Sequence, residues 1–106
     1  MNEYIRAVKI GSDGSFVDTD MPNTLEAFQE AVGGYIQTIF LGGGILLICN
    51  EEGVLRRLPE NYRAGKICGE AHVATRIFGN VIFVGDNGSD EFVSLTDAQA
   101  LLLERI

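Results

Sequence analysis

The stretch YIQTIFLGGGILLICN, residues 35–50, decides how this chain folds. Residues 35–41 and 45–50 are rich in β-branched and other apolar side chains, which is typical of strands. The three glycines at 42–44 can adopt the positive φ angles of a tight turn. A phosphate-binding loop would need a helix after its glycines, whereas a second strand-like segment follows here. The stretch therefore predicts an antiparallel hairpin.

A shorter hairpin is expected near the N-terminus. Residues 4–10 partly alternate apolar and polar side chains, and a second short strand is expected around residues 15–18. The cluster Gly11-Ser12-Asp13-Gly14 between them is typical of a turn. We expect the two strands to pair with each other.

A helix is predicted between the two hairpins, over residues 24–32. Asn23 is the expected N-cap, and Glu26 three residues later would complete a capping box. Apolar side chains then recur at helical spacing until Gly33-Gly34, a pair that favours helix termination.

Beyond residue 50, the sequence predicts one more strand against the central hairpin. Asn50-Glu51-Glu52-Gly53 is typical of a tight turn, after which residues 54–58 would pair back on the preceding strand. Pro59 would end that strand. Residues 60–69 are irregular and polar, and residues 71–78 fit either a strand or a helical turn.

The C-terminal part predicts two strands and a helix. The continuous apolar run at 81–84 is typical of a buried strand, and residues 91–95 form a further strand-like segment after a polar loop. Thr96 and Gln99 have the spacing of a capping box, which opens the last helix. The apolar side chains of that helix are Ala98, Leu101, Leu102 and Ile106.

These elements define the expected fold class. Strands outnumber helices and most connections are tight turns, so we expect an α+β fold. It would consist of a largely antiparallel sheet of about 5–7 short strands with two helices packed on it. The 106 residues suit one compact domain, residues 1–106.

Overall charge and hydropathy exclude several function classes. Eight Lys and Arg residues against fifteen Asp and Glu residues give a formal net charge of −7, which opposes binding to a long phosphate backbone. No apolar run approaches the roughly 18 residues that span a bilayer, so we expect no membrane partner. The N-terminal residues include Glu3 and Arg6 and lack the apolar segment of a signal peptide, which favours a cytoplasmic location.

The charge is unevenly distributed along the chain. Residues 56–76 hold five basic and two acidic residues, a net charge of +3, while the remainder of the chain carries −10. Arg side chains bind carboxylates and phosphates through two hydrogen bonds, an aromatic ring can stack on a base, and an amide can recognise a base or a ribose. The candidate ligand-binding residues are Arg56, Arg57, Asn61, Tyr62, Arg63 and Lys66. The alternative is a solvated loop whose charges pair with the chain's own carboxylates.

No catalytic constellation is complete in the sequence, and we expect no enzymatic activity. His72 could act as a general base, but no partner for it is evident. Cys49 and Cys68 fit no zinc-ligand spacing and are expected to be two buried thiols, so no metal or cofactor is expected. The loop Asp86-Asn87-Gly88-Ser89-Asp90 lacks the later bidentate Glu of a calcium loop.

Several motifs together carry a resemblance to a known family. They are NTLEAFQ (23–29) with VGGYI (32–36), LICNEEG (47–53), LPEN (58–61), IFGNVIFVG (77–85) and FVSLTD (92–97). In this respect the chain resembles the family catalogued as domain of unknown function 3846, which occurs in bacteriophages and mobile elements. The resemblance implies an accessory protein of such an element, acting in the host cytoplasm if phage-encoded, and it brings no catalytic residues.

Three hypotheses for function follow. The leading one is a non-catalytic binding module that counters host defence by sequestering a small anionic, nucleotide-like ligand. The alternative is an acidic, protein-binding inhibitor of a host defence or DNA-binding enzyme, and the third is a minor nucleotide hydrolase. Exposed edges in a small antiparallel sheet also predict a homo-oligomer.

Overall fold

The central hairpin forms as the glycine-containing stretch predicts. In the computed structural model, which describes residues 3–106, β3 (Ile36–Gly42) pairs antiparallel with β4 (Ile45–Asn50). All three glycines of the turn have positive φ, between 62° and 80°. Side chains other than Gly rarely adopt this conformation, so the glycines allow the chain to reverse within a few residues.

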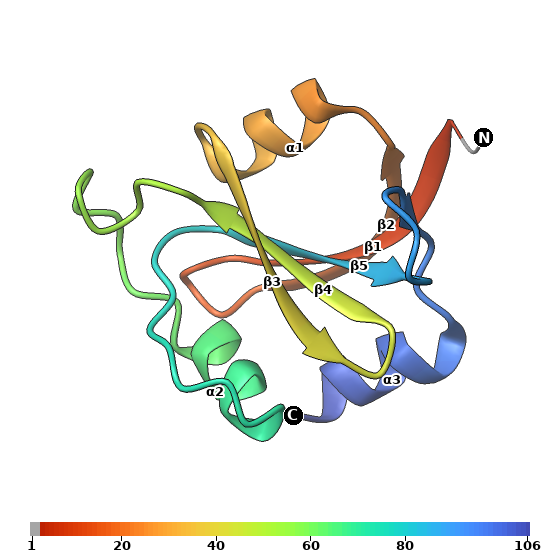
Figure 1. The fold of residues 1–106 in the computed structure, drawn as a ribbon. Helices are drawn as coiled ribbons and strands as arrows, with labels where there is room; N and C mark the ends of the chain where they lie inside the picture. Colours follow the sequence, from red (N-terminus) through yellow and green to blue (C-terminus); the bar gives the residue numbers. More distant parts are fainter. Residues whose placement is uncertain (1–2) are drawn as a thin grey trace.

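A single antiparallel sheet organises the described residues (Figure 1). The first hairpin, β1 (Tyr4–Ile10) and β2 (Phe16–Pro22), joins it through β5 (Val81–Asp86). The strand order is β2-β1-β5-β4-β3, and the short strand β6 (Phe92–Val93) pairs with β5. Both expected hairpins are therefore confirmed, and β2 is longer than the predicted 15–18.

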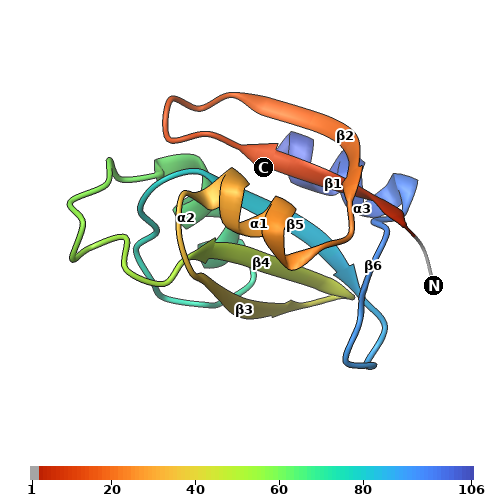
Figure 2. The ribbon, with the colours of Figure 1, turned by 90° about the horizontal axis from the view of Figure 1, so that it is seen from above.

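Helices cover both faces of the sheet. Helix α1 (Leu25–Val32) lies on one face, and helices α2 (Tyr62–Glu70) and α3 (Asp97–Arg105) lie on the other (Figures 1 and 2). Two clusters of buried apolar side chains fill the two interfaces. Because the central strands β4 and β5 lie between these clusters, all of β4 and all of β5 except its last residue are buried. This explains the continuous apolar runs that the two strands show in the sequence.

The described residues form three helices, so the prediction of two helices is wrong. The additional helix, α2, falls within residues that look irregular in the sequence. Its N-cap is Asn61, and its buried side chains Ala64, Ile67 and Cys68 have the spacing of one helical face. The α+β class and the six strands agree with the expectation.

The cap of α1 differs from the predicted one by one residue. Thr24 is the N-cap, and its hydroxyl oxygen accepts a hydrogen bond from the backbone N–H of Ala27 at 3.2 Å. The side-chain amide of Asn23 instead donates to the carbonyl oxygen of Phe92, 3.2 Å away. The capping box of Thr96 and Gln99 at the start of α3 is confirmed.

Residues 54–58 do not form the predicted strand. They belong to a series of turns, closed by backbone hydrogen bonds from Arg56 to Glu52 and from Leu58 to Gly53. The physical reason is topological, because β4 is paired on both sides, with β3 and β5, and offers no free edge. The predicted strand 91–95 is likewise reduced to the two residues of β6.

Residues 71–78 are neither of the two expected elements and have largely irregular structure. One isolated bridge between Glu60 and Phe78 holds the start and the end of the α2 region together. None of the helices in the described part of the chain is long and apolar enough to cross a membrane.

Candidate functional site

Asn61 is a structural residue, although its amide was a candidate ligand-binding group. Its side chain is only 1% exposed. Nδ2 donates to the carbonyl oxygens of Ile10 (3.0 Å) and Gly79 (2.9 Å), and Oδ1 accepts from the backbone N–H of Ala64 at 3.0 Å. The amide thus caps α2 and joins it to two other segments, and it is not available to a ligand.

Arg63 is also engaged within the fold. Its guanidinium donates to the carbonyl oxygens of Gly14 (3.0 Å) and Glu104 (3.3 Å). The guanidinium carbon lies 4.8 Å from the centroid of the Phe16 ring, a cation–π contact. The side chain thereby connects α2 with the β1–β2 hairpin and with α3.

Two further arginines of the basic segment pair with nearby carboxylates. Arg56 contacts Glu52, four residues earlier, at 3.2 Å. Arg76 contacts Glu60 at 2.6 Å, and its guanidinium lies 5.2 Å from the centroid of the Phe78 ring. The hydrogen bond from Arg76 lowers the pKa of the Glu60 carboxyl, which keeps that group ionised. These pairs are the solvated arrangement expected under the alternative interpretation of the basic segment.

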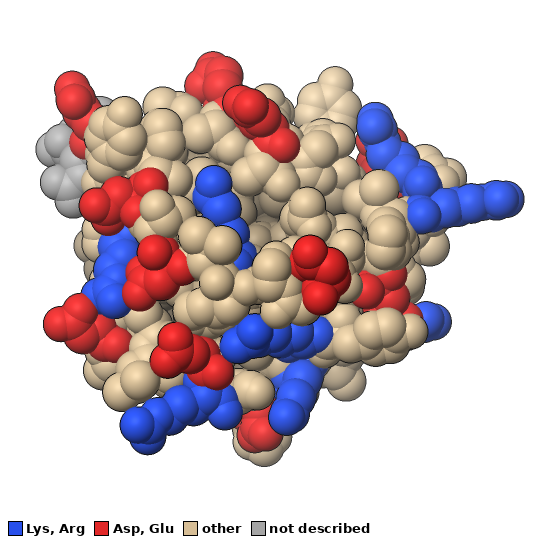
Figure 3. Space-filling model, turned by 180° about the vertical axis from the view of Figure 1, so that it is seen from behind, with Lys and Arg blue, Asp and Glu red and all other residues tan. Residues whose placement is uncertain are grey.

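The remaining candidates, Arg57, Tyr62 and Lys66, are exposed. Tyr62 and Lys66 are four residues apart on α2, so they share one face of that helix. Figure 3 shows basic and acidic side chains intermingled on one side of the molecule rather than gathered by sign. The predicted residues are therefore divided between groups bound within the fold and groups that are exposed.

The turn-rich loop at residues 51–57 is a distinctive surface feature of this region. It projects from the body of the molecule in both ribbon views (Figures 1 and 2). Val54 and Leu55 are 70% and 77% exposed, and the exposed Arg56 and Arg57 follow them directly. Arg57 has φ 56°, the left-handed region that a non-Gly residue rarely adopts. The sequence does not indicate this loop, because the apolar residues Val54 and Leu55 are typical of a strand.

A cleft of about 430 Å³ lies beside this loop, which we call the loop cleft. Gln37 and Ile39 of β3 line it together with Glu51 and Glu52 of the loop. Its remaining walls come from the end of β4, from Gly53, Val54 and Leu55, and from residues 75–78. Arg76 is therefore the one arginine of the basic segment that lines the loop cleft.

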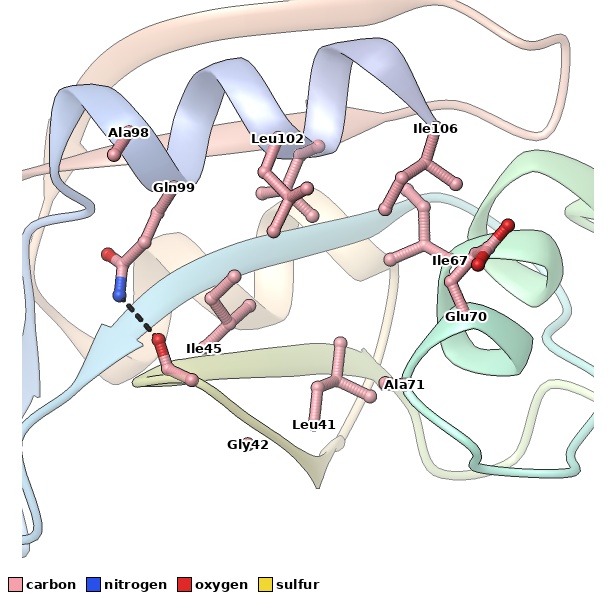
Figure 4. Close-up of a pocket in the computed structure, with 12 residues that line it drawn as sticks. Leu41, Gly42, Ile45, Ile67, Glu70, Ala71, Ala98, Gln99, Leu102 and Ile106 are labelled. Atoms are coloured by element: carbon pink, nitrogen blue, oxygen red, sulfur yellow. Dashed lines mark hydrogen bonds between the residues drawn. The ribbon is translucent and has the colours of Figure 1, made fainter.

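A second cleft, of about 450 Å³, is apolar and lies between the β3–β4 turn, α2 and α3 (Figure 4). Gln99 spans one side of it, and its Nε2 donates to the carbonyl oxygen of Gly43 at 2.8 Å. Three apolar residues of the last helix and its end, Ala98, Leu102 and Ile106, line this cleft rather than being buried. The buried residues of α3 are Ala100 and Leu103. This cleft can accommodate an apolar group, and the polar side chains that line it are those of Gln99 and Glu70.

The two thiols are withdrawn from solvent, whereas the single histidine is exposed. Cys49 and Cys68 are buried free thiols, as predicted, and burial together with the neighbouring Cys68 raises the pKa of Cys49 to about 11. His72 is exposed in the turn after α2 with φ 61°. Over residues 3–106, no group of three or more His, Cys, Asp and Glu side chains is arranged to hold a metal ion.

The fold and these clefts define a small α+β domain with one antiparallel sheet between helices. The chain belongs to the family described as Domain of unknown function (DUF3846), whose model matches residues 5–106. The resemblance seen in the sequence motifs is thereby confirmed over essentially the whole chain. Neither a curated protein nor a solved structure matches the chain.

Proposed function

We propose that this domain is a non-catalytic binding module that captures a small anionic, nucleotide-like ligand at the loop cleft. One observation carries the proposal. Arg76 lines a cleft of about 430 Å³, and Arg56 and Arg57 lie in the loop that borders this cleft. In the phage and mobile-element context that the resemblance implies, such capture would withhold the ligand from a host defence protein.

The ion pairs at this site do not oppose the proposal. Exposed pairs such as Arg56–Glu52 stabilise a protein by only about 0–1 kcal/mol. A phosphate presents more charge and more acceptor oxygens than a carboxylate and takes two hydrogen bonds from one guanidinium. Arg56 can therefore exchange its carboxylate partner for a phosphate. Arg76, whose side chain is 73% exposed, can add a phosphate contact beside Glu60, and Arg57 adds a further positive charge in the same loop as Arg56.

Calorimetric titration with a panel of cyclic and linear nucleotides and ADP-ribose tests this proposal. We expect one member to bind, and we expect Arg76→Gln and Arg57→Gln each to weaken binding roughly tenfold or more, since hydrogen bonds to charged groups are strong. Arg105→Gln is the matched control, because Arg105 is an exposed arginine of α3 that lines neither cleft.

Two outcomes would contradict the proposal. If the folded protein binds no member of the panel, the hypothesis of an anionic, nucleotide-like ligand is excluded. The nucleotide is also analysed by chromatography after the titration. If it is recovered as a cleaved product, the protein is a nucleotide hydrolase and not a non-catalytic binding module.

A second candidate function, a protein-binding inhibitor, is favoured by the exposure of Val54 and Leu55. Large aliphatic side chains at the tip of a loop gain free energy when a partner surface covers them. Arginine is enriched in protein interfaces, and Arg56 and Arg57 would suit acidic groups on that partner. The predicted version of this function, an acidic inhibitor of a host enzyme, would instead depend on the chain's carboxylates.

Affinity capture with two matched variants tests the protein-binding function. Leu55→Ser changes the loop, and Leu101→Ser changes an exposed leucine on α3 as a control. We expect a partner to be retained by the wild type and by Leu101→Ser at low salt and lost with Leu55→Ser. Equal retention by all three chains would exclude the loop as the contact.

A further inference from the structure

The two edges of the sheet differ in their chemistry. Strand β2 forms one edge and contains Asp18, Asp20 and Pro22. Charged side chains and proline are the features by which natural proteins protect an edge from pairing with another chain. Strand β3 forms the opposite edge, and its sequence IQTIFLG has no Asp, Glu, Lys, Arg or Pro. The β3 edge therefore lacks the charged side chains and the proline of the β2 edge, and its irregularity between Phe40 and Gly42 lies at the end of the strand.

The residues of β3 favour strand pairing. Ile36, Thr38, Ile39 and Phe40 are β-branched or aromatic, which are the residue types with the highest strand preference. An edge strand presents a row of backbone N–H and C=O groups on its outer side, and another strand can bind to them.

The apolar surface beside this edge is also uncovered. Phe40 lies opposite Leu46, which belongs to the cluster on the α1 face, and it is nevertheless 68% exposed. The reason is visible in Figure 2, where α1 lies over β4 and β5 while β3 runs along the margin of the sheet. A strand added beside β3 would place its own side chains next to the Phe40 ring and reduce that exposure.

We propose that two copies of this chain pair through their β3 strands, antiparallel and about a twofold axis, to form one continuous sheet. An antiparallel strand is complementary to itself about such an axis, so one surface suffices for both subunits. Electrostatics favour this edge over the other, because two chains of net charge −7 repel and a charge-free strand meets its copy with the least repulsion.

The arrangement also has a consequence for the loop cleft. Gln37 and Ile39 of β3 line that cleft, so pairing through β3 brings the loop clefts of the two copies near the twofold axis. The dimer would then present two ligand sites, or two copies of loop 51–57, on neighbouring parts of one surface.

Analytical ultracentrifugation over a range of protein concentrations tests the dimer. For the wild type we expect a mass twice the 11.5 kDa of one chain, with stronger association at higher salt because salt screens the repulsion. Thr38→Glu adds a charge to the exposed centre of β3 and should weaken association at least tenfold. Val17→Glu, at an exposed position of β2, is the matched control and should remain dimeric.

Two further measurements keep the test decisive. Circular dichroism shows whether each variant is folded, and Phe40→Ser replaces Thr38→Glu if the latter is not. Amide hydrogen exchange of β3 should slow as the wild-type concentration rises. The proposal would be overturned if the wild type stays monomeric at all concentrations. This includes the case in which β3 pairs only with a strand of another protein. Loss of the dimer in Val17→Glu but not in Thr38→Glu would do so as well.

Discussion

At the scale of single residues, Asn61 shows how one side chain can organise a region. Its amide forms hydrogen bonds to β1, to Gly79 and to the first turn of α2, three segments that are distant in sequence. An amide that satisfies buried backbone groups cannot be replaced by water without opening the core. Asn61 therefore decides where α2 begins and how it is held against the sheet.

We predict that Asn61→Ala lowers the free energy of unfolding by roughly 2–4 kcal/mol, because it removes a helix cap and two buried hydrogen bonds to backbone carbonyl oxygens. Urea unfolding followed by circular dichroism measures this, since the chain has no Trp for fluorescence. Asn87→Ala is the control, because Asn87 is exposed and accepts one local hydrogen bond from the N–H of Ser89. Equal effects of the two substitutions would contradict the structural role of Asn61.

The two thiols provide a second prediction at this scale. Burial is the main cause that raises the pKa of Cys49, to about 11, and it also raises the pKa of Cys68. Since the thiolate is the reactive form, we expect neither thiol of the folded protein to react appreciably with a disulfide reagent at pH 8. In concentrated guanidinium both should react at once. One rapidly reacting thiol in the folded protein would show that the burial of Cys49 or Cys68 is incomplete.

At the scale of elements, helix α2 explains the main error of the sequence-based prediction. Gly65 and Gly69 and several polar side chains give residues 62–70 the composition of a loop. A helical signal was nevertheless present, because Ala64, Ile67 and Cys68 have helical spacing and Asn61 stands three residues before Ala64. Packing against the sheet overrides the weak helix preference of this segment.

The difference between local sequence signals and contacts across the chain also explains how much of the candidate site could be predicted. The sequence located the basic segment, but it could not distinguish Arg57, which is exposed, from Arg63, whose guanidinium is bound to the carbonyl oxygens of Gly14 and Glu104. That distinction depends on contacts across the chain, which no local pattern contains. The hairpins were predictable because glycine turns and apolar runs are local signals.

One glycine lies within a helix and another ends a helix, and the two predict opposite effects of substitution by alanine. Gly69 lies in α2 without a positive φ, and a Cβ added there would meet no atom within 4 Å. We expect Gly69→Ala to raise the free energy of unfolding by about 0.5–1 kcal/mol, because Ala restricts the unfolded chain and favours the helix. Gly33→Ala should lower it by roughly 1 kcal/mol, since Gly33 ends α1 with φ 81°.

Urea unfolding of both glycine variants beside the wild type checks this pair. The sign of the difference is the critical observation, because both substitutions add the same methyl group in open space. Destabilisation by Gly69→Ala would indicate that residue 69 is not helical in solution.

At the scale of the whole molecule, one basic side chain joins the sheet edge to the last helix. Arg6 of β1 donates hydrogen bonds to Asp18 of β2, at 2.8 and 3.0 Å, and contacts Asp97 at the start of α3. The backbone N–H of Arg6 also donates to the hydroxyl of Ser94. In a chain with net charge −7, this guanidinium reduces the repulsion between carboxylates that the fold brings together.

This arrangement predicts how stability changes with pH. The hydrogen bonds from Arg6 lower the pKa of Asp18 from its ordinary value of 3.8. A carboxyl whose pKa is lower in the folded state than in the unfolded state stabilises the fold above the unfolded value and loses that contribution as the pH falls through the folded one. The stabilisation by Asp18 should therefore be complete at pH 6 and disappear as the pH falls below about 4.

Comparison of the wild type with Asp18→Asn isolates this contribution from the other carboxyl groups. We expect the variant to have the lower urea midpoint at pH 6 and the two midpoints to converge as the pH falls below about 4, because the protonated Asp18 resembles the amide. Asp90→Asn, in the exposed loop before β6, should leave the midpoint close to that of the wild type at pH 6. A difference between wild type and Asp18→Asn that grows as the pH falls would have the wrong sign for a carboxyl stabilised in its charged form, and would mean that Arg6 does not hold Asp18 in solution.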